Sequence, residues 1–504
     1  MYTLGIDIGT SGTKTVLFDR CGRKIASATA EYPLYQPQNG WAEQNPADWW
    51  DAVCQTVRTV TENIAPEEIS GIGLSGQMHG LVMLDAQDRV LRPAILWCDG
   101  RTGAECAEIE RRLTRERLIA VTANPALAGF TASKILWVQK NEPEIWAKCR
   151  RILLPKDYIR FMLTGEYATE VSDASGMQLL DVPGRCWAQE VLDALNIREN
   201  QLGKVYESPQ ITGCVTPQAA ALCRLKAGIP VVGGAGDNAA AAVGLGVVRD
   251  GRAFTTVGTS GVVFAHTDRI SIDPAGRVHT FCCAVPGAWH VMGVTQAAGL
   301  SLRWMRDMFC DAERDAAEKR GCDPYDIMTA EAAACPVGAE RLLYLPYLMG
   351  ERTPHLDPMA RGAFVGLSAV HTRAHMIRAV MEGVSYSLYD CVEILRGMHA
   401  LPQEMQVCGG GGKSAFWRQM LADVFGMPVI RSSSDEGPAL GAAILAMVGA
   451  GIYPDVRTAC DSVIAERDRT LPDAAAHTEY RKFYEIYTSL YGSLKDGFAR
   501  LGNC

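Results

Sequence analysis

The tetrapeptide Gly-Thr-Ser-Gly occurs twice in the chain, each time between two runs rich in β-branched and apolar residues. The first copy lies in GIDIGTSGTK, residues 5–14, and the second in TTVGTSGVVF, residues 255–264. Two such runs around a short glycine-containing stretch predict a β-hairpin. Because glycine permits tight turns and close approach, each turn can present several backbone N–H groups and two hydroxyls. The repeat therefore predicts two similar halves, each beginning with the same hairpin.

A turn of this kind can serve as a plain connection, or its N–H groups can bind an anion. Each copy alone favours the connection, whereas two copies near the starts of two halves favour loops that hold different phosphates of one nucleotide. Only the first copy carries charges, because alignment places Asp7 opposite Thr256 and Lys14 opposite Val263. A carboxylate beside a phosphate loop can hold Mg²⁺ directly or through water, and Lys14 can add a positive charge. The alternative for Asp7 is a hairpin-end residue that bonds the turn backbone.

The length of the chain suits two domains, since 504 residues is long for one. We place the boundary in the charged, glycine-containing segment Val247 to Arg252, which gives domains 1–247 and 252–504. A helix should begin at Asn45 and Pro46, as N-cap and first residue. The tail places aromatic and leucine residues on one face of a helix, which is typical of a packing surface. Further expected strands are 69–74, 82–84, 230–232 and 406–412, and further expected helices are 373–394, 437–448 and 480–494.

The overall composition argues against several classes of partner. A formal net charge of −8 disfavours nucleic acid or an anionic membrane surface as the main partner, although backbone groups can still hold a small anion. The longest apolar stretch, 239–248, is too short to span a bilayer, and the N-terminus lacks the basic region of a signal peptide. The seventeen cysteines form no C-x-x-C pair and no zinc-type spacing with histidine. We therefore expect free thiols and a cytoplasmic protein.

Two glycine-rich segments look like nucleotide motifs but do not fit them. Residues 71–76, GIGLSG, match G-x-G-x-x-G, yet the segment itself is typical of a strand and no strand–loop–helix unit follows. Residues 409–414, GGGGKS, look like a P-loop, but the first glycine of that motif would fall at Val407. A glycine-rich strand end could still let a nucleotide base or ribose lie against Gly410 and Gly411, the alternative being a plain turn.

A third glycine-rich segment, GGAGDN at 233–238, precedes an alanine-rich helix. Asp237 is either the N-cap of that helix, a role that aspartate often fills, or a reactive carboxylate. The two roles are compatible, because a helix N-terminus also stabilises negative charge. The residue pattern alone leaves both open.

With these segments in place, the chain resembles the FGGY family of carbohydrate kinases from about Gly5 to Gly451. DIGTSGTK and VGTSG are similar to the family's two phosphate motifs, GGAGDN to the segment of its catalytic aspartate, and CGGGGKSAFW to its adenosine motif. GFTASKILWVQKN at 129–141 and GAFVGLSAVHTRAHMIRAVME at 362–382 resemble its two signatures. The resemblance implies an α/β fold of two actin/Hsp70/hexokinase-like (ribonuclease H-like) domains, with ATP and sugar in the cleft between them.

The resemblance also implies a role for each segment. Asp237 is expected to be the general base that takes a proton from the sugar hydroxyl, and Asp7 to bind Mg²⁺ through water. The expected sugar contacts are Gln77, Met78, His79 and Asn238, the alternative for His79 being a purely structural histidine. The expected ATP contacts are Gly9, Thr10, Ser11, Lys14, Gly258, Thr259, Ser260, Gly410 and Gly411.

The choice of substrate rests on fewer residues. The loop SGQMHG at 75–80, with GWAEQNPADWW, LRPAILWCDGR, LLPKDY and GERTPH, is similar to the branch of the family that phosphorylates D-xylulose. One departure is Cys98, where relatives commonly read Trp-Asn-Asp, and it could shift the ketose preference. The resemblance implies MgATP-dependent phosphorylation of D-xylulose at O5, with cleft closure excluding water, and a possible homodimer.

Two alternatives remain at this point. The first is a sibling kinase for another ketose or polyol, such as ribulose or a deoxy-ketose. The second, from another class, is an actin- or Hsp70-like ATP-driven interaction protein that shares the phosphate loops. SGQMHG and GGAGDN argue against the second alternative.

Overall fold

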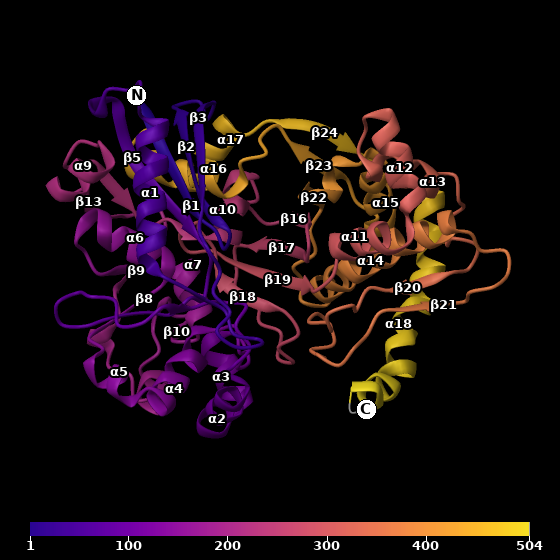
Figure 1. Ribbon diagram of the computed structural model, residues 1–504, viewed down its shortest axis with the longest axis horizontal. Helices are drawn as coiled ribbons and strands as arrows, with labels where there is room; N and C mark the ends of the chain where they lie inside the picture. The colour runs from indigo at the N-terminus through magenta and orange to yellow at the C-terminus, as the bar shows by residue number, and fades with distance from the viewer. Residues whose placement is uncertain (503–504) are drawn as a thin grey trace.

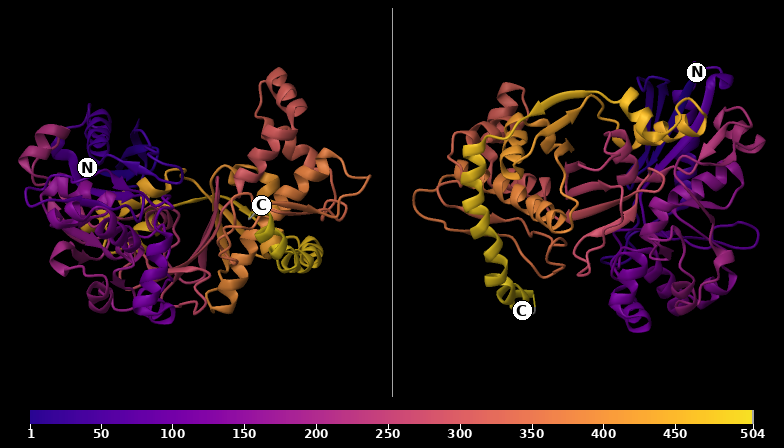
Figure 2. Two further views of the ribbon diagram at one scale, coloured as in Figure 1. Left: turned by 60° about the horizontal axis from the view of Figure 1, so that its bottom comes forward. Right: turned by 180° about the vertical axis from the view of Figure 1, so that it is seen from behind.

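The chain forms two α/β halves, each built on a seven-stranded sheet (Figures 1 and 2). The computed structural model describes residues 1–502. The first sheet has the strand order β13 (Ile211–Cys214), β14 (Pro230–Val232), β5 (Ile69–Gly76), β1 (Tyr2–Ile8), β2 (Gly12–Asp19) and β3 (Lys24–Glu31). Its seventh strand, β15 (Ala235–Gly236), pairs with β5 outside this order. The second has the order β18 (His279–Cys282), β19 (Trp289–Thr295), β17 (Gly261–Thr267), β16 (Arg252–Val257), β22 (Glu404–Cys408), β23 (Val429–Ser432) and β24 (Glu466–Thr470).

The same unit recurs in both sheets. The antiparallel hairpins β1–β2 and β16–β17 each enclose one Gly-Thr-Ser-Gly turn, and a parallel strand lies beside the first strand of each, β5 in one half and β22 in the other. The predicted hairpins, the internal repeat and the two-part α/β fold are therefore confirmed.

The first half covers its sheet with helices and carries an added helical region. Helix α1 (Pro46–Val60) begins as predicted, with the Asn45 side chain accepting a hydrogen bond from the Ala47 amide at 3.3 Å. Helices α2 to α5 gather at the end of this half farthest from the N-terminus in Figure 1. The remaining elements are β4 (Glu43–Gln44), η1 (Pro66–Glu68), β6 (Val82–Leu84), β7 (Ala94–Ile95), α2 (Gly103–Leu113), α3 (Arg115–Thr122), α4 (Thr131–Asn141), α5 (Pro143–Lys148), β8 (Arg151–Leu153), α6 (Pro155–Thr164), β9 (Ala168–Glu170), α7 (Val171–Ala174), η2 (Ser175–Met177), β10 (Leu180–Asp181), β11 (Cys186–Trp187), α8 (Gln189–Ala194), η3 (Glu199–Gln201), β12 (Lys204–Tyr206), α9 (Pro217–Cys223) and α10 (Asp237–Gly244).

The second half packs its sheet against a long buried helix, α14 (Arg373–Gly397), and α18 (Ala474–Gly502) packs on α14. The predicted stripe on the tail helix does pack: Tyr480 and Tyr487 are buried, and Phe483, Leu490 and Leu494 lie against the same core. The predicted strand at 406–412 ends at Cys408, because the glycines turn into a short helix, η4 (Gly411–Lys413). The remaining elements are α11 (Gly299–Phe309), α12 (Asp311–Arg320), α13 (Pro324–Ala333), β20 (Leu343–Leu345), β21 (Ala363–Val365), α15 (Ala415–Phe425), α16 (Gly437–Gly449) and α17 (Val456–Val463).

One helix that follows the predicted domain boundary packs on the first sheet. Helix α16 lies against β1 and β5, beside α10, as its position near β2 in Figure 1 shows. The contact needs glycine, since a Cβ on Gly5 would lie 1.9 Å from the carbonyl oxygen of Ala439. The division into 1–247 and 252–504 stays a prediction, and the packing of α16 crosses it.

Two expectations from composition can be compared with residues 1–502. Every cysteine in this range is a free thiol, and Cys504 lies outside the described residues. Across the same range, no helix combines the length and the apolar character that crossing a membrane requires.

Candidate functional site

Two carboxylates meet at the centre of the first half. Asp7 is the second-to-last residue of β1, and Asp237 begins α10 directly after β15. Asp7 and Ala235 pair with Ser75 of β5 from its two sides, which brings Asp7 and Asp237 together. Burial, and after it the charge of Asp7, raises the pKa of Asp237 to about 6. Burial also raises the pKa of Asp7, against a 2.8 Å hydrogen bond from the Ser75 hydroxyl that lowers it. Such a pair holds a proton readily and attracts a cation.

The helix start fixes Asp237. Gly236 occupies the N-cap position and Asp237 is the first helical residue, so the alternative of Asp237 as N-cap is not realised. The amide and the side-chain nitrogen of Asn238 donate to Oδ1 of Asp237 at 2.7 and 3.0 Å. In residues 1–502, Oδ2 of Asp237 has no hydrogen-bond donor of its own. This oxygen is therefore placed to accept a proton.

The residues around Asp7 fit a magnesium ion that is held mainly by water and substrate phosphates. Within the described chain, no group of three or more histidine, cysteine, aspartate or glutamate side chains forms a complete metal cage. Mg²⁺ commonly binds through one or two carboxylates, with water and substrate phosphates as the other ligands. Asp7, supported by Ser75 and facing Asp237, offers this kind of partial site.

The predicted sugar loop carries a neutral histidine. His79 has a left-handed backbone, with φ of 67°, and its Nδ1 lies 2.7 Å from the carbonyl oxygen of Gly176. Burial, and after it the charge of Lys134, lowers the pKa of His79 to about 3. Because a carbonyl can only accept, Nδ1 carries the proton and Nε2 is left as an acceptor. A sugar hydroxyl is a suitable donor for it.

The neighbours of His79 have different surroundings. Met78 packs in an apolar cluster with Phe130 of the first half and Phe281 of the second, so it lies between the halves. Gln77 is buried, and its amide bonds the carbonyl oxygen of Gly9 at 3.3 Å and the side chain of Gln44 at 3.0 Å. In this structure Gln77 thus supports the first phosphate loop, and its predicted contact with sugar stays a prediction. Asn238 is placed beside Asp237.

The first Gly-Thr-Ser-Gly turn is held from several sides. The Tyr32 hydroxyl donates to the Gly9 carbonyl at 2.5 Å, and the Gln44 amide donates to the Thr10 carbonyl at 2.7 Å. The Trp97 indole donates to the Thr10 hydroxyl at 2.9 Å, and Cys98 lies exposed beside this tryptophan. Ser11 is exposed at the tip. The loop is therefore rigid and open on one side, as phosphate binding requires.

The Lys14 ammonium group is already paired with a carboxylate in this structure. It forms an ion pair with Glu436, the residue before α16, and Lys24 pairs with the same carboxylate at 3.0 Å. Since Glu436 is distant in the sequence, this competing partner was not predicted. Binding of a phosphate by Lys14 requires Glu436 to give up or share the lysine.

The second Gly-Thr-Ser-Gly turn rests on the start of α11. Its Gly258 carbonyl accepts from the Gly299 amide at 2.6 Å, and its Thr259 carbonyl accepts from the amides of Ala298 and Leu300 at 3.0 and 3.1 Å. The Thr259 side chain is exposed, and that of Ser260 is partly exposed. The loop thus presents its hydroxyls while its carbonyls are occupied.

Two neighbouring cavities connect Asp237 and the second Gly-Thr-Ser-Gly turn with the glycine-rich segment, whereas the first turn lines neither of them. Asp237, Asn238, Thr256 and Gly410 line one of about 520 Å³. Gly258, Thr259, Gly410 and Gly411 line one of about 550 Å³. A Cβ on Gly411 would lie 2.5 Å from a Val257 side-chain carbon, so glycine is needed there. The structure therefore places the predicted base, the second phosphate loop and the predicted adenosine glycines along one continuous surface.

Sequence reasoning missed several residues of this site. Lys413 lines both cavities, but it was set aside together with the imperfect P-loop motif. Lys134 is buried and donates to the carbonyls of His79 and Gly129 at 2.8 and 2.7 Å, which fixes the sugar loop. Ser75 lay within the quoted sugar loop and could have been proposed as the partner of Asp7. Trp97 carries no local signal for its contact with Thr10.

Comparison with known proteins agrees with this geometry. The N- and C-terminal domain models of the FGGY family of carbohydrate kinases match residues 2–244 and 253–450. A xylulose kinase from Escherichia coli (strain K12) is 41% identical over 495 residues, which are 98% of this chain and 99% of that protein. A gluconokinase from Bacillus subtilis (strain 168) is 33% identical over 504 residues, which are 100% of this chain and 98% of that protein. The crystal structure of a xyloylose kinase from Brucella ovis is similar with a TM-score of 0.90 and 37% identity, covering 98% of this chain and 100% of that one. The chain belongs to the FGGY family of carbohydrate kinases.

Proposed function

We propose that the protein transfers the γ-phosphoryl group of ATP to O5 of D-xylulose and forms D-xylulose 5-phosphate. The observation that carries the proposal is Asp237, whose pKa is raised to about 6 and which lines the 520 Å³ cavity together with Gly410. A base with this pKa is largely ionised at neutral pH and still accepts a proton effectively. Similarity to the xylulose kinase from Escherichia coli supports the choice of sugar.

Each part of the site has a role in the proposed reaction. Oδ2 of Asp237 takes the proton of the sugar hydroxyl as the hydroxyl oxygen bonds to the γ-phosphorus and ADP leaves, while Asn238 holds Oδ1. Nε2 of His79 accepts a hydrogen bond from another sugar hydroxyl and orients the ring or chain. The two Gly-Thr-Ser-Gly loops, with Lys14, bind the phosphates. Asp7 would hold Mg²⁺, which when bound would offset phosphate charge. Positioning and charge neutralisation supply most of the rate, as in other phosphoryl transfers.

A second candidate is phosphorylation of another polyol or sugar acid. It is favoured by the 33% identity to the gluconokinase from Bacillus subtilis and by the position of Cys98 beside Trp97. Family membership gives no support to the alternative of an actin- or Hsp70-like interaction protein. A homodimer and a cytoplasmic location stay predictions.

The test is ADP release with MgATP against D-xylulose, D-ribulose, L-ribulose, L-xylulose, gluconate and glycerol. We expect D-xylulose to give the highest kcat/KM, and Asp237→Asn to lower kcat by about 10²–10⁴-fold. Asp311→Asn is the control and should leave kcat unchanged, because within residues 1–502 this solvent-exposed carboxylate pairs with Arg314 alone. Preference for another substrate would move the proposal to that substrate, and full activity of Asp237→Asn would refute the assigned base.

A further inference from the structure

The hairpin β18–β19 belongs to the second sheet, but the residues on both sides of its turn are buried against the first half. Cys282 packs in the same apolar cluster as Leu180 and Val182 of the first half. Cys283, Val285 and Ala288 pack in another cluster that contains residues of α10 and α16. The exposed fractions of these four residues lie between 0% and 6%, while Pro286 and Gly287 at the turn itself are exposed. The first half therefore encloses the segments that flank the turn, while the strands extend into the second half.

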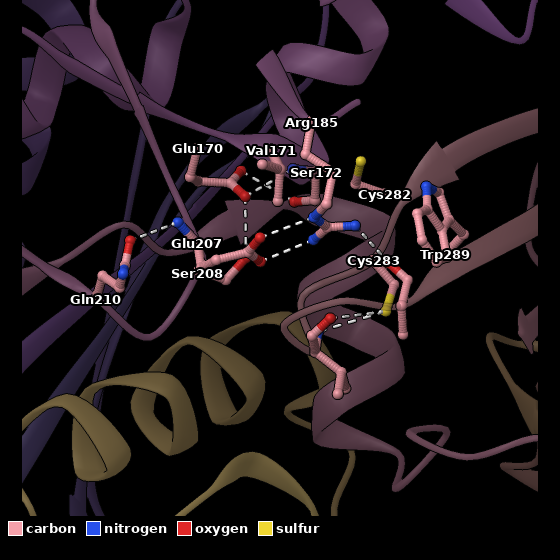
Figure 3. A network of polar contacts seen from close by, with 12 residues as sticks. Glu170, Val171, Ser172, Arg185, Glu207, Ser208, Gln210, Cys282, Cys283 and Trp289 are labelled. Carbon is pink, nitrogen blue, oxygen red and sulfur yellow. Dashed lines mark hydrogen bonds and ion pairs between the residues drawn. The ribbon is translucent and has the colours of Figure 1, made fainter. Parts of the chain in front are cut away.

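Arg185 of the first half binds the segment that follows the turn and leads into β19 (Figure 3). Its Nε and Nη2 each donate to one carboxylate oxygen of Glu207 at 2.7 Å, and its Nη1 donates to the Ala288 carbonyl at 3.0 Å. The guanidinium also lies 5.2 Å from the ring centroid of Trp289, the first residue of β19. The Trp289 indole in turn donates to the Val182 carbonyl at 3.0 Å. One planar group thus joins an acid of the first half to the backbone of the second.

The backbone of Arg185 has a left-handed conformation in a turn. Arg185 follows Gly184 in the turn between β10 and β11 and has φ of 56°, in the left-handed region. Residues other than glycine and asparagine adopt this region at a conformational cost. The position therefore carries an arginine where the local turn favours glycine, and the guanidinium is what reaches the hairpin.

The other end of β19 reaches the second phosphate loop. Thr295, its last residue, pairs with Gly261, which directly follows Ser260. Glu351 accepts from the Thr295 hydroxyl at 2.6 Å and from the Gln296 amide at 3.0 Å, so this end is fixed as well. One extended strand of seven residues therefore connects the contact of Arg185 with the phosphate loop.

The sugar loop meets the same hairpin through two adjacent residues of η2. His79 bonds the Gly176 carbonyl at 2.7 Å, and the Cys282 amide of β18 donates to the Ser175 hydroxyl at 3.0 Å. Ser175 is itself held, since its hydroxyl donates to the Val171 carbonyl at 2.6 Å. A shift of His79 on sugar binding can therefore pass to the hairpin over a short, packed path.

We propose that Arg185 is a positioning residue that fixes the β18–β19 hairpin to the sugar-binding half, so that the hairpin links occupancy of the sugar pocket to the second phosphate loop. This inference rests on the proposed function, because it takes the His79 pocket as the sugar site and the Thr259 loop as a nucleotide site. Its consequence is that sugar and nucleotide bind more tightly together than apart, and that this mutual dependence needs Arg185.

The first experiment measures that dependence directly. The affinity for D-xylulose is determined by calorimetry with and without the β,γ-imido analogue of ATP, in the unmodified protein and in Arg185→Gln. Coupling between two sites commonly changes an affinity by about 5–150-fold. We expect the coupling factor to fall toward one in Arg185→Gln, while the affinity for D-xylulose alone stays within about twofold. Arg185→Lys should be intermediate, because one ammonium cannot reach both Glu207 and Ala288 in the same planar geometry.

The chain offers a matched control. Arg117 makes the same two-pronged pair with Glu190, at 2.9 and 2.6 Å, but both residues lie in the first half and neither touches the hairpin. Arg117→Gln removes an arginine–glutamate pair without loosening the contact between halves. It should keep the coupling factor of the unmodified protein.

A second experiment needs no sugar. In ligand-free protein, we expect Arg185→Gln to speed amide hydrogen exchange in the buried segments that flank the turn of the hairpin, including the Cys282 amide. Exchange there should be slower in the unmodified protein and in Arg117→Gln. Faster exchange with unchanged coupling would make Arg185 a structural clamp only and overturn the positioning role. Unchanged exchange in a folded Arg185→Gln would overturn the clamp itself. If the unmodified protein phosphorylates none of the sugars tested above, the proposed function fails, while the exchange result still decides the clamp.

Discussion

At the scale of single residues, the pair Asp7 and Asp237 sets the main electrostatic cost of the site. The pKa of Asp237 is about 6 in the folded protein, above its ordinary value of 3.8. A raised folded pKa means that the folded state binds the proton more tightly than the unfolded state does. The resulting stabilisation is complete below the unfolded pKa and is lost as the pH rises through the folded pKa.

The first prediction follows from this sign. Asp237→Asn removes the unfavourable ionisation, so at pH 7.5 the free energy of unfolding should increase by about 1–3 kcal/mol. The gain should shrink as the pH falls from 6 toward 4, because Asp237 is then protonated in the unmodified protein as well. Urea unfolding at pH 7.5 and pH 5 measures both values. A variant that is less stable at pH 7.5 would contradict the assigned cost of burying the ionised Asp237 carboxylate beside Asp7.

The second prediction concerns the ion pair between Lys14 and Glu436. Glu436→Gln removes a carboxylate that competes with phosphate for Lys14, so KM for MgATP should fall by up to about fivefold, the range of a partly exposed pair. Initial rates at saturating sugar measure it. Lys24→Gln serves as control, because it removes the other partner of Glu436 and leaves the Lys14 pair in place. A higher KM in Glu436→Gln would show that the carboxylate assists nucleotide binding.

At the scale of elements, the crossing of α10 and α16 holds Asp237 in place. A Cβ on Gly441 of α16 would lie 1.8 Å from the carbonyl oxygen of Ala240, which follows Asp237 by one turn of α10. The third prediction is that Gly441→Ala lowers the free energy of unfolding by about 1–3 kcal/mol and also lowers kcat, because α10 must shift. Thermal unfolding and ADP release measure the two effects.

Gly492→Ala in α18 is the matched control for Gly441→Ala. Apart from its chain neighbours and its own helix backbone, no atom of residues 1–502 lies within 4 Å of the added Cβ, so the change only improves helix propensity. It should leave kcat unchanged and raise stability by about 0.5–1 kcal/mol. Equal losses in both variants would argue against close helix packing as the cause.

The elements that the sequence predicted well are those with local signals. The two hairpins, the Asn45 cap of α1 and the helix of small residues at 437–449 follow from turn glycines, a capping side chain and an apolar run. Motif resemblance likewise placed Asp7 and Asp237 in one site. The sequence carried no signal for the sheet on which α16 rests, for Glu436 as partner of Lys14, or for Gln44 and Gly9 as partners of Gln77. These contacts join segments far apart in the chain, and their specificity arises only from tertiary packing.

At the scale of the whole molecule, the 520 Å³ cavity lies where the halves meet, with Asp237 from one half and Gly410 from the other lining the same space. We expect the halves to close on a bound sugar, since closure would exclude water and align the hydroxyl. The fourth prediction is that ATP hydrolysis without sugar is much slower than sugar phosphorylation. ADP release with and without D-xylulose measures the ratio, and comparable rates would contradict a closure mechanism.

The path of the chain between the halves limits how related genes can be recombined. The polypeptide passes between them three times, from α10 to β16, from β23 to α16 and from α17 to β24, and the last two passages are joined by a hydrogen bond from the Ser433 amide to the Ala465 carbonyl at 2.9 Å. A chimaera that exchanges everything after residue 250 would therefore lay a foreign α16 on the original β1 and β5. A chimaera that folds must keep residues 437–463 together with the sheet that they cover. The segment that can be exchanged is therefore a packed layer and not a continuous stretch of sequence.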